Sequence, residues 1–324
     1  MNYNTDIIVG LQNLKEGKTK ILKKLLNESH YDLCIKINGG TETSYIKYND
    51  ELILLKEIPY SILYNIDTYI SESCLVNLDD LKEDIEKLKH LNISLKKLFI
   101  SNNTSIITNK NIIENKQKHI INYKYKNLNT LRDKYSNNNL LKIKDLTSVE
   151  YYYFLMKNSV TRVDSYDFFK NYKKILAYQF LSFNNDIDFG NNIVNSGFHC
   201  SSSFCFNIIN FKSLSNIFGV CCVYEIFEDY KLHNEELDII LSYDSPLLYY
   251  DWLDLNTLIK NINLNNINIL YFTKTDILNK INIFKIKYNN NIHNFDSIEL
   301  FKFFIKEKIN LECNISYVNF LSNY

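Results

Sequence analysis

The amino-acid sequence predicts an α/β fold in which a central, mostly parallel sheet is flanked by helices. Short β-branched runs recur along the chain, amphipathic segments separate them, and a hydrophobic content of 46% can fill a large core. Strands that alternate with helices are typical of parallel sheets, because the helices cover both faces. No proline- or glycine-rich linker divides the chain, so we expect residues 1–324 to form a single domain.

The elements are predicted from the spacing of apolar residues. The expected helices have apolar positions at helical spacing, and Asn77 is the expected N-cap of the second one. The stretch 102–139, rich in Asn and Lys, has the weakest pattern and is interpreted as a mobile surface excursion. The strands are expected at 5–9 (in the interior of the sheet), 31–37, 51–56, 69–70, 97–100, 175–181, 218–227, 267–272 and 281–288, and the helices at 18–27, 78–90, 252–261 and 297–308.

The charge composition limits the possible partners. The chain has 37 basic and 37 acidic residues and a formal net charge of +0, so nothing favours a nucleic acid or an anionic membrane. Arg132 and Arg162 are the only arginines. Because arginine is the residue that binds carboxylates and phosphates in a bidentate manner, a site that needs several arginines is excluded.

Cysteine usage and the N-terminal sequence predict a cytoplasmic protein. The seven cysteines include no CxxC pair and the histidines are scattered, which argues against a zinc site and favours buried free thiols. The first ten residues lack the basic start and long apolar stretch of a signal peptide. The most apolar segment, 217–227, is too short to span a bilayer.

Glycine is scarce, and its positions are therefore informative. Of the seven glycines, four fall within the first forty residues, at Gly10, Gly17, Gly39 and Gly40. Glycine is required where φ is positive or where the backbone closely approaches a ligand. The first two follow the β-branched run 7–9 and precede an amphipathic segment, which predicts strand, loop and helix. Backbone N–H groups at such a helix start can bind an anion, although an ordinary strand-to-helix turn remains an equal alternative.

Several blocks along the chain occur in a characteristic order. They are GLQNLKEGKTK at 10–20, GGTETSYI at 39–46, IPYSIL at 58–63, DIDFGNNI at 186–193, DWLD at 251–254 and TKTDILNK at 273–280. Their order and spacing resemble the adenylosuccinate synthetase family, whose GTP-dependent enzymes join aspartate to IMP in AMP synthesis. The resemblance runs from about residue 6 to the C-terminus, and it implies the family's P-loop-type GTP-binding architecture.

The resemblance implies a set of nucleotide-binding residues. Asp276 would accept hydrogen bonds from the N1–H and N2–H₂ groups of guanine, and the stem of Lys274 would cover the ring. The alternative is a strand-end turn capped by Asp276. The full implied set is Gln12, Glu16, Gly17, Lys18, Thr19, Gly39, Gly40, Thr273, Lys274 and Asp276.

The sequence departs from the family at its catalytic positions. Lys15 stands where the family has the aspartate that acts as catalytic base and magnesium ligand, and Tyr45 stands where it has the catalytic acid histidine. Tyrosine, with an ordinary pKa of about 10, is a poor proton donor at neutral pH. No catalytic residue is therefore assigned. The backbone of Gly40 is the remaining candidate metal contact, which argues against magnesium.

The anion-binding loops of the family are also altered. The segment 122–134 corresponds to the loop that surrounds the IMP phosphate, and it has no glycine. The segment 245–250 corresponds to an arginine-rich loop, and it has no arginine. Loss of one transition-state contact commonly reduces the rate by about 10²–10³-fold, so we expect the family reaction to be impaired.

Three functional hypotheses follow. The first is a pseudoenzyme that binds GTP or another guanine nucleotide, or that binds a protein partner, as a homodimer or as a heterodimer with an active homologue. The second is an active ligase of altered specificity that joins aspartate to a purine nucleotide. The third is a structural or host-interaction protein that keeps only the inherited fold.

Overall fold

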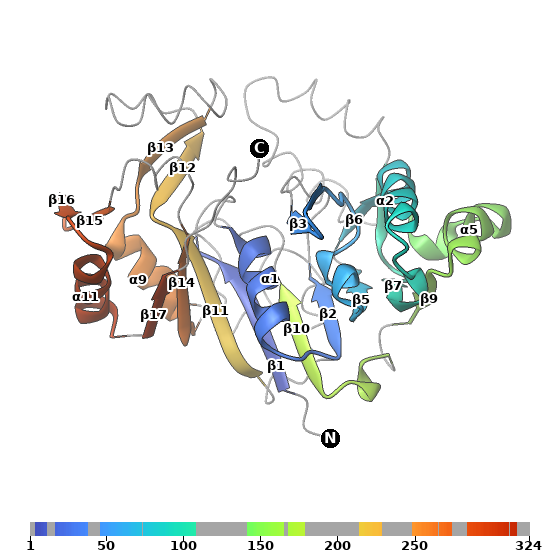
Figure 1. The fold of residues 1–324 in the computed structure, drawn as a ribbon, viewed down its shortest axis with the longest axis horizontal. Coiled ribbons are helices and arrows are strands. Elements are labelled where there is room, and N and C mark those ends of the chain that lie inside the picture. The colour runs from blue at the N-terminus through green and yellow to red at the C-terminus, as the bar shows by residue number, and fades with distance from the viewer. Residues whose placement is uncertain are drawn as a thin grey trace. The chain divides into compact units, whose positions relative to one another are not determined.

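The computed structural model of the chain (Figure 1) describes residues 4–11, 17–37, 46–72, 74–107, 141–164, 168–178, 214–228, 248–264, 266–273, 284–310 and 312–315. All structural statements below refer to these residues. Among their helices, none combines the length and the apolar character that a membrane crossing requires.

The main sheet has nine strands in the order β17-β14-β11-β1-β10-β2-β5-β7-β9. The pairings of β10 with β2, β2 with β5, β5 with β7, β7 with β9, β11 with β14 and β14 with β17 are all parallel. This confirms the predicted mostly parallel α/β sheet, and β1 is an interior strand as predicted. The strands are β1 (Asn4–Gly10), β2 (Leu33–Lys36), β5 (Asp67–Ile70), β7 (Leu98–Ser101), β9 (Thr161–Val163), β10 (Lys174–Tyr178), β11 (Leu214–Cys222), β14 (Ile269–Thr273) and β17 (Glu312–Ile315).

Four smaller pairs accompany the main sheet. They are β3 (Ile46–Tyr48) with β4 (Glu51–Ile53), β6 (Leu75–Asn77) with β8 (Ser105–Ile107), β12 (Tyr224–Glu228) with β13 (Leu248–Trp252), and β15 (Phe284–Tyr288) with β16 (Asn291–Phe295). The prediction of one strand at 218–227 was wrong, because the chain breaks at Val223 and β12 leaves the main sheet to pair with β13.

The four predicted helices are present. The prediction for 78–90 matches α2, and the Asn77 side chain caps it by accepting a hydrogen bond from the Asp79 N–H at 2.9 Å. The prediction for 252–261 was displaced, because Trp252 belongs to β13 and the Asp254 carboxylate accepts from the Asn256 N–H at 2.8 Å at the start of the helix. The described helices are α1 (Lys18–Glu28), α2 (Leu78–His90), α5 (Ser148–Phe154), α9 (Leu255–Leu264) and α11 (Ile298–Ile309), with short 3₁₀ turns η1 (Tyr60–Tyr64), η2 (Leu95–Lys97), η3 (Ile143–Asp145), η4 (Met156–Asn158) and η5 (Phe169–Asn171).

The chain divides into two compact units, each made from discontinuous segments. The first comprises Met1–Ile7, Leu22–Leu181 and Asn191–Ser215, and the second comprises Ile8–Ile21, Ser182–Gly190 and Asn216–Tyr324. The apolar stripe of α2, Leu81, Ile85 and Leu88, packs into the core of the first unit. In the second unit, Phe301 of α11 packs edge-on against Phe272 of β14, with 5.5 Å between ring centroids. The prediction of a single domain stays a prediction.

The polar stretch that was predicted to form an excursion begins as ordered, buried structure. Thr104 is fully buried and directly precedes β8, and Ile106 within β8 is 4% exposed. The prediction of a mobile surface excursion was therefore wrong for Thr104 to Ile106. Residues 108–139, which make up the rest of the stretch, lie outside the described residues.

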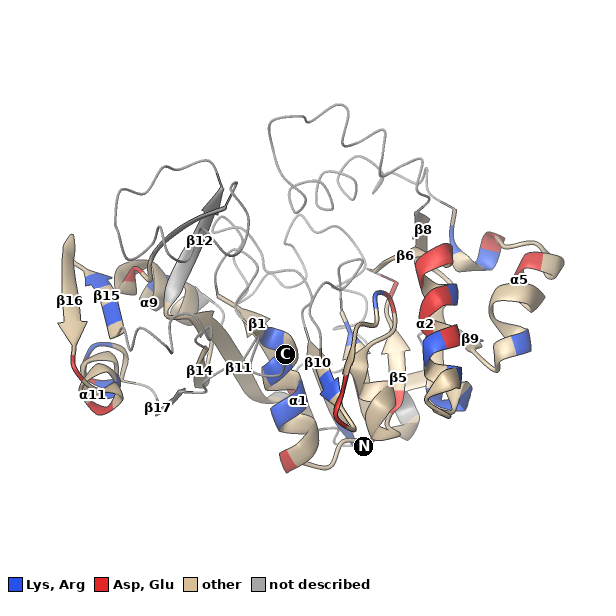
Figure 2. Cartoon of the chain, turned by 45° about the horizontal axis from the view of Figure 1, so that its top comes forward, with Lys and Arg blue, Asp and Glu red and all other residues tan. Residues whose placement is uncertain are grey.

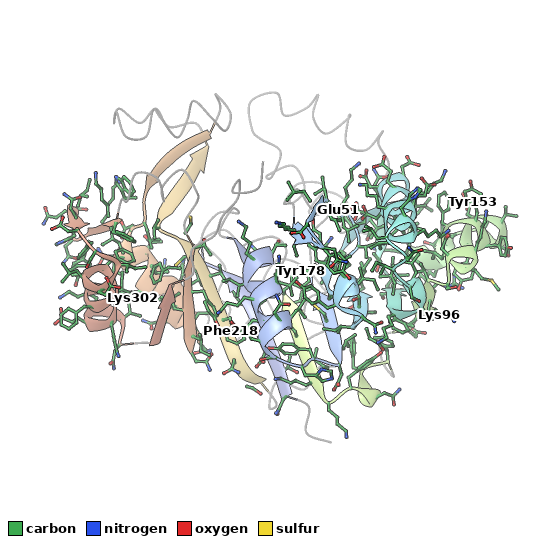
Figure 3. All side chains as sticks on the ribbon, in the orientation of Figure 1. Glu51, Lys96, Tyr153, Tyr178, Phe218 and Lys302 are labelled. Atoms are coloured by element: carbon green, nitrogen blue, oxygen red, sulfur yellow. The ribbon has the colours of Figure 1, made fainter. Side chains whose placement is uncertain are left out.

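Large apolar side chains are exposed along α5 and the turn that follows it. Val149, Tyr152, Tyr153 and Met156 are each about half exposed or more. Figure 3 labels Tyr153, which projects from α5, and the Lys157 ammonium lies 5.5 Å from its ring centroid. Such a cation covers part of the face of the ring and leaves the rest available to solvent.

Asparagine supplies most of the left-handed backbone positions in the described chain. The two residues that join β3 to β4 are Asn49 and Asp50, and those that join β15 to β16 are Asn289 and Asn290, all with positive φ. Hairpin turns of this kind commonly use Asn-Gly, because both central residues need positive φ. The non-glycine residues with positive φ are Asn49, Asp50, Asn65, Asn92, Ser159, Asn266, Asn289, Asn290 and Asn310.

One buried carboxylate of α2 holds the segment that precedes η1. Asp84 is fully buried, and its carboxylate accepts hydrogen bonds from the N–H groups of Lys56 at 2.9 Å, Glu57 at 2.7 Å and Ile58 at 3.0 Å. Burial raises the pKa of the Asp84 carboxyl, and these donors oppose that shift. These three hydrogen bonds join α2 to the segment 56–58, which is not part of a strand.

We predict that Asp84→Asn lowers the free energy of unfolding by about 1–3 kcal/mol, because the amide N–H₂ must face at least one of these backbone donors. Urea denaturation followed by circular dichroism measures the change. Glu86→Gln, an exposed substitution on the same helix, is the control. Equal stability of both variants would show that the three hydrogen bonds do not stabilise the fold.

Candidate functional site

The candidate site is formed where β1 and α1 are joined. β1 ends at Gly10, Leu11 continues it, and α1 begins at Lys18. Residues 12–16 lie outside the described residues, so the site is defined by the two ends of the connection. Both ends belong to the second compact unit, together with β14, α9 and most of β11.

The first end is held by β11. The Leu11 N–H donates to the Val220 carbonyl at 3.0 Å, which extends the backbone pairing one residue beyond β1. A Cβ atom added to Gly219 would lie 2.7 Å from Leu11 Cδ1 and 2.8 Å from Ile267 Cγ2. Because real Cβ atoms do not approach other atoms so closely, a larger residue at 219 would require the Leu11 or Ile267 side chain to shift.

The second end is held by β14. Gly17 has φ +87°, and an added Cβ atom would lie 3.0 Å from Thr273 Cγ2 and 3.2 Å from Thr273 Oγ1. The Gly17 carbonyl accepts from the N–H groups of Lys20 at 3.0 Å and Ile21 at 3.3 Å, which starts α1. Gly17 therefore meets two requirements at once, a positive φ and a close approach to Thr273.

The chain itself separates these two requirements. At most other positions with positive φ the described residues use asparagine, as at Asn65 and Asn310, the C-caps of η1 and α11. Gly17 is the only glycine with positive φ among them. The contact with Thr273 explains why asparagine, which would add a side chain, does not occupy this position.

Thr273 lies at the carboxyl end of β14 and is 1% exposed. Its hydroxyl donates to the Cys221 carbonyl at 3.4 Å, and its carbonyl accepts from the Val223 N–H at 3.1 Å. These bonds fix the last residue of β14 against the end of β11. Phe218 of β11, labelled in Figure 3, and Tyr271 of β14 pack together nearby along the same pair, with 5.7 Å between ring centroids.

The start of α1 carries positive charge. Lys18 and Lys20 lie in its first turn, which has no acidic residue, and Lys18 is 6% exposed. The first turns of α2, α5 and α11 each contain Asp or Glu, as the helix dipole favours. Figure 2 shows basic colouring along α1, whereas α2 has both acidic and basic positions. Cations at the positive end of a helix suit an anionic ligand, because the ligand offsets both charges.

The structure brings together some of the predicted site residues. Gly17, Lys18 and Thr19 lie at the start of α1, and Thr273 contacts Gly17. The other predicted residues lie outside the described ones. They are Gln12, Lys15, Glu16, Gly39, Gly40, Tyr45, Lys274 and Asp276, and the segments 122–134 and 186–193 lie outside as well.

The described cysteines match the prediction of structural thiols. Cys34, Cys74, Cys221 and Cys222 are all buried. Burial raises the pKa of the Cys34 thiol to about 12, which keeps it protonated and unreactive at neutral pH.

Sequence reasoning did not identify three contributors to the site. Gly219 could have been found from the scarcity of glycine, since it interrupts an apolar run. Val220 contributes only its carbonyl, which no sequence pattern reveals. Asn261 lies in α9, 250 residues from the Leu11 carbonyl to which its side chain donates, so only the tertiary structure connects them.

The fold and the site define an α/β protein with a mostly parallel sheet, in which Leu11 at the end of the first strand and Gly17 at the start of the first helix are both closely packed. The sequence profile described as adenylosuccinate synthetase matches residues 7–133, which include this connection. The solved structure of fully ligated adenylosuccinate synthetase from Plasmodium falciparum has the same fold, with a TM-score of 0.67, 18% identity and coverage of 97% of both chains.

Two further groups of known proteins are similar. Succinoaminodeoxyadenylate synthetase of cyanophage S-2L, bound to dGMP and dATP as an energy donor, has a TM-score of 0.66 at 12% identity, and covers 99% of this chain and 93% of its own. Adenylosuccinate synthetase of Buchnera aphidicola (strain Tuc7) is 34% identical over 110 residues, and that of Acaryochloris marina is 30% identical over 102 residues. These matches cover 33% and 31% of this chain, and 25% and 22% of the relatives' length.

Residues 7–133 are thus similar in sequence to the adenylosuccinate synthetase family, as the sequence blocks predicted. The likeness in fold to the solved synthetases extends over nearly the whole chain at low sequence identity.

We predict that Gly17→Asn destabilises the chain about as much as Gly17→Ala, by about 1–3 kcal/mol. Asparagine tolerates positive φ, so equal losses indicate that the contact with Thr273 decides the outcome. Thermal unfolding measures both variants. Thr273→Ser removes the Cγ2 atom and should recover part of the loss in the double variant. A Gly17→Asn variant as stable as the wild type would contradict the close-approach argument.

Proposed function

We propose that this chain is a member of the adenylosuccinate synthetase family that binds a guanine nucleotide and is impaired in the family's ligase reaction. The observation that supports this proposal most directly is the close approach of Gly17 to Thr273. It joins the start of α1, where the phosphates would bind, to the residue that immediately precedes Lys274 and Asp276, which would recognise the base. Two segments more than 250 residues apart in the sequence are thus held in one unit.

The phosphate end of the site is supported by charge. Lys18 and Lys20 lie at the positive end of the helix dipole, and neither has an acidic neighbour in that turn. A phosphate group there would accept hydrogen bonds from backbone N–H groups and offset the lysine charges. GTP, GDP and GMP all carry such a group, so the proposal names the class of ligand, a guanine nucleotide.

The impairment rests on the catalytic positions. Lys15 provides a cation where a general base and metal ligand are required, and Tyr45 is a weak acid where a proton donor is required. Magnesium would have no carboxylate at residue 15, so nucleotide binding should depend little on it. Arg162 is already engaged in the first unit, where its guanidinium lies 4.3 Å from the Tyr151 ring centroid.

A second candidate is a ligase of altered specificity. The fold matches that of the cyanophage S-2L enzyme over 99% of this chain, and that structure holds dGMP. An acceptor other than IMP would account for changed residues at the acceptor positions. A different acceptor would not by itself replace the missing base. We therefore rank the ligase of altered specificity second and test it in the same assay.

We predict that the purified chain forms no adenylosuccinate from IMP, aspartate, GTP and magnesium, because base, acid and arginine contacts are replaced. Mass spectrometry of the products, with the Plasmodium falciparum enzyme as positive control, measures the outcome. Parallel reactions replace IMP by dGMP and GTP by dATP.

Two variants interpret any product that forms. Lys18→Ala removes the cation at the start of α1, whereas Lys24→Ala alters an exposed ion pair with Glu28 on the same helix. Product that appears with the wild type and Lys24→Ala but not with Lys18→Ala would overturn the impairment. Product from dGMP alone would establish the second candidate.

We predict that the chain prefers guanine to adenine nucleotides through Asp276. A carboxylate pairs with the N1–H and N2–H₂ donors of guanine but faces the N1 lone pair of adenine, a difference of about 1–3 kcal/mol. Isothermal titration calorimetry with GDP and ADP, with and without magnesium, measures the preference.

The control for this prediction is Asp296→Ala, which removes an exposed carboxylate of the same unit. Asp276→Ala should abolish the preference and Asp296→Ala should retain it. Equal affinities for GDP and ADP in the wild type would contradict guanine recognition, and absence of any binding would leave the fold without the proposed function.

A further inference from the structure

The backbone of Leu11 is held from two sides at the point where the chain leaves β1. Its N–H donates to the Val220 carbonyl of β11 at 3.0 Å. Its carbonyl accepts from Nδ2 of Asn261 at 2.8 Å, and the two residues are 3% and 8% exposed. The hydrogen bond from Asn261 therefore lies in the interior, where it is shielded from competition with water.

Asn261 is an exception on its own helix. The neighbouring buried positions of α9 are apolar, at Leu255, Leu258 and Ile262, and helical spacing would favour another apolar residue at 261. Burying an amide is unfavourable unless it is hydrogen-bonded. A buried polar residue on an apolar face is therefore informative, and its partner here is the last described carbonyl before residue 12.

We propose that Asn261 is a positioning residue that sets the direction in which the chain leaves β1 toward α1. The amide fixes the Leu11 peptide, while Gly17 is fixed at the other end by Thr273. A connection held at both ends loses less conformational freedom when a ligand binds, which strengthens binding without any contact between Asn261 and the ligand. This inference rests on the proposed nucleotide-binding function.

The geometry also predicts which part of the ligand is affected. Asn261 acts on the end of the connection at Leu11, and the phosphate groups would bind between that end and Lys18. The segment that would recognise the base follows Thr273, which is held by Cys221 and Val223 rather than by Asn261. Loss of the amide should therefore weaken the binding of phosphate-bearing ligands and spare the binding of the nucleoside.

The test compares Asn261→Leu and Asn261→Ala with the wild type. Leucine has a similar volume and suits the apolar face of α9, but it donates no hydrogen bond, so it separates the donor from the packing. Asn261→Ala is the second variant in case leucine prevents folding. Asn263→Ala, an exposed substitution two residues further along α9, is the control.

Two measurements are made on each protein. Calorimetry with GDP and guanosine should show about tenfold weaker GDP binding in both Asn261 variants, the equivalent of one hydrogen bond, with unchanged guanosine binding. Hydrogen–deuterium exchange without ligand should be faster in peptides that span Leu11 to Gly17, and unchanged in peptides from α2.

The outcomes separate the inference from the proposed function. Equal losses for GDP and guanosine, or unchanged exchange between Leu11 and Gly17, would overturn the positioning role and leave nucleotide binding standing. A wild type that binds neither GDP nor guanosine would overturn the proposed function. If exchange between Leu11 and Gly17 is nevertheless faster in the Asn261 variants, the positioning role of Asn261 would stand.

Discussion

The close packing of backbone at Gly17 and Gly219 is the constraint on which the site depends. Each glycine lies where an added methyl group would overlap a neighbouring side chain, Thr273 in one case and Leu11 in the other. The two contacts lie at opposite ends of the connection between β1 and α1. Both neighbours donate hydrogen bonds to carbonyls of β11, Leu11 to Val220 and Thr273 to Cys221, so both contacts are anchored on the same strand.

Packing and electrostatics contribute different things to the proposed site. The packing argument concerns shape alone and would hold for any ligand, or for none. The charge argument concerns the sign of the ligand, because the first turn of α1 has lysines and no carboxylate. The proposal of an anionic ligand therefore rests on the charge, and the packing explains only how the two ends of the connection are held. Neither argument bears on catalysis, which depends on the residues at 15 and 45.

The sequence predicted the sheet and the helices well, because their apolar spacing is regular. It placed α2 and its cap Asn77 correctly, and it separated Lys18–Glu28 from the preceding strand. It failed where tertiary partners decide, since β12 looks like a continuation of β11 until it pairs with β13. For the site, glycine scarcity identified Gly17, whereas Thr273 came from the family resemblance. The hydrogen bond of Asn261 spans 250 residues and could not be predicted from any local pattern.

The use of asparagine at left-handed positions has a consequence for the unfolded chain. Glycine has the most backbone freedom of any residue, and a chain that contains many of them loses the most entropy on folding. With asparagine in its hairpin turns and at the C-caps Asn65 and Asn310, this chain begins from a narrower unfolded ensemble. Part of its stability therefore comes from the smaller conformational entropy of the unfolded chain. This contribution does not correspond to any contact in the folded structure.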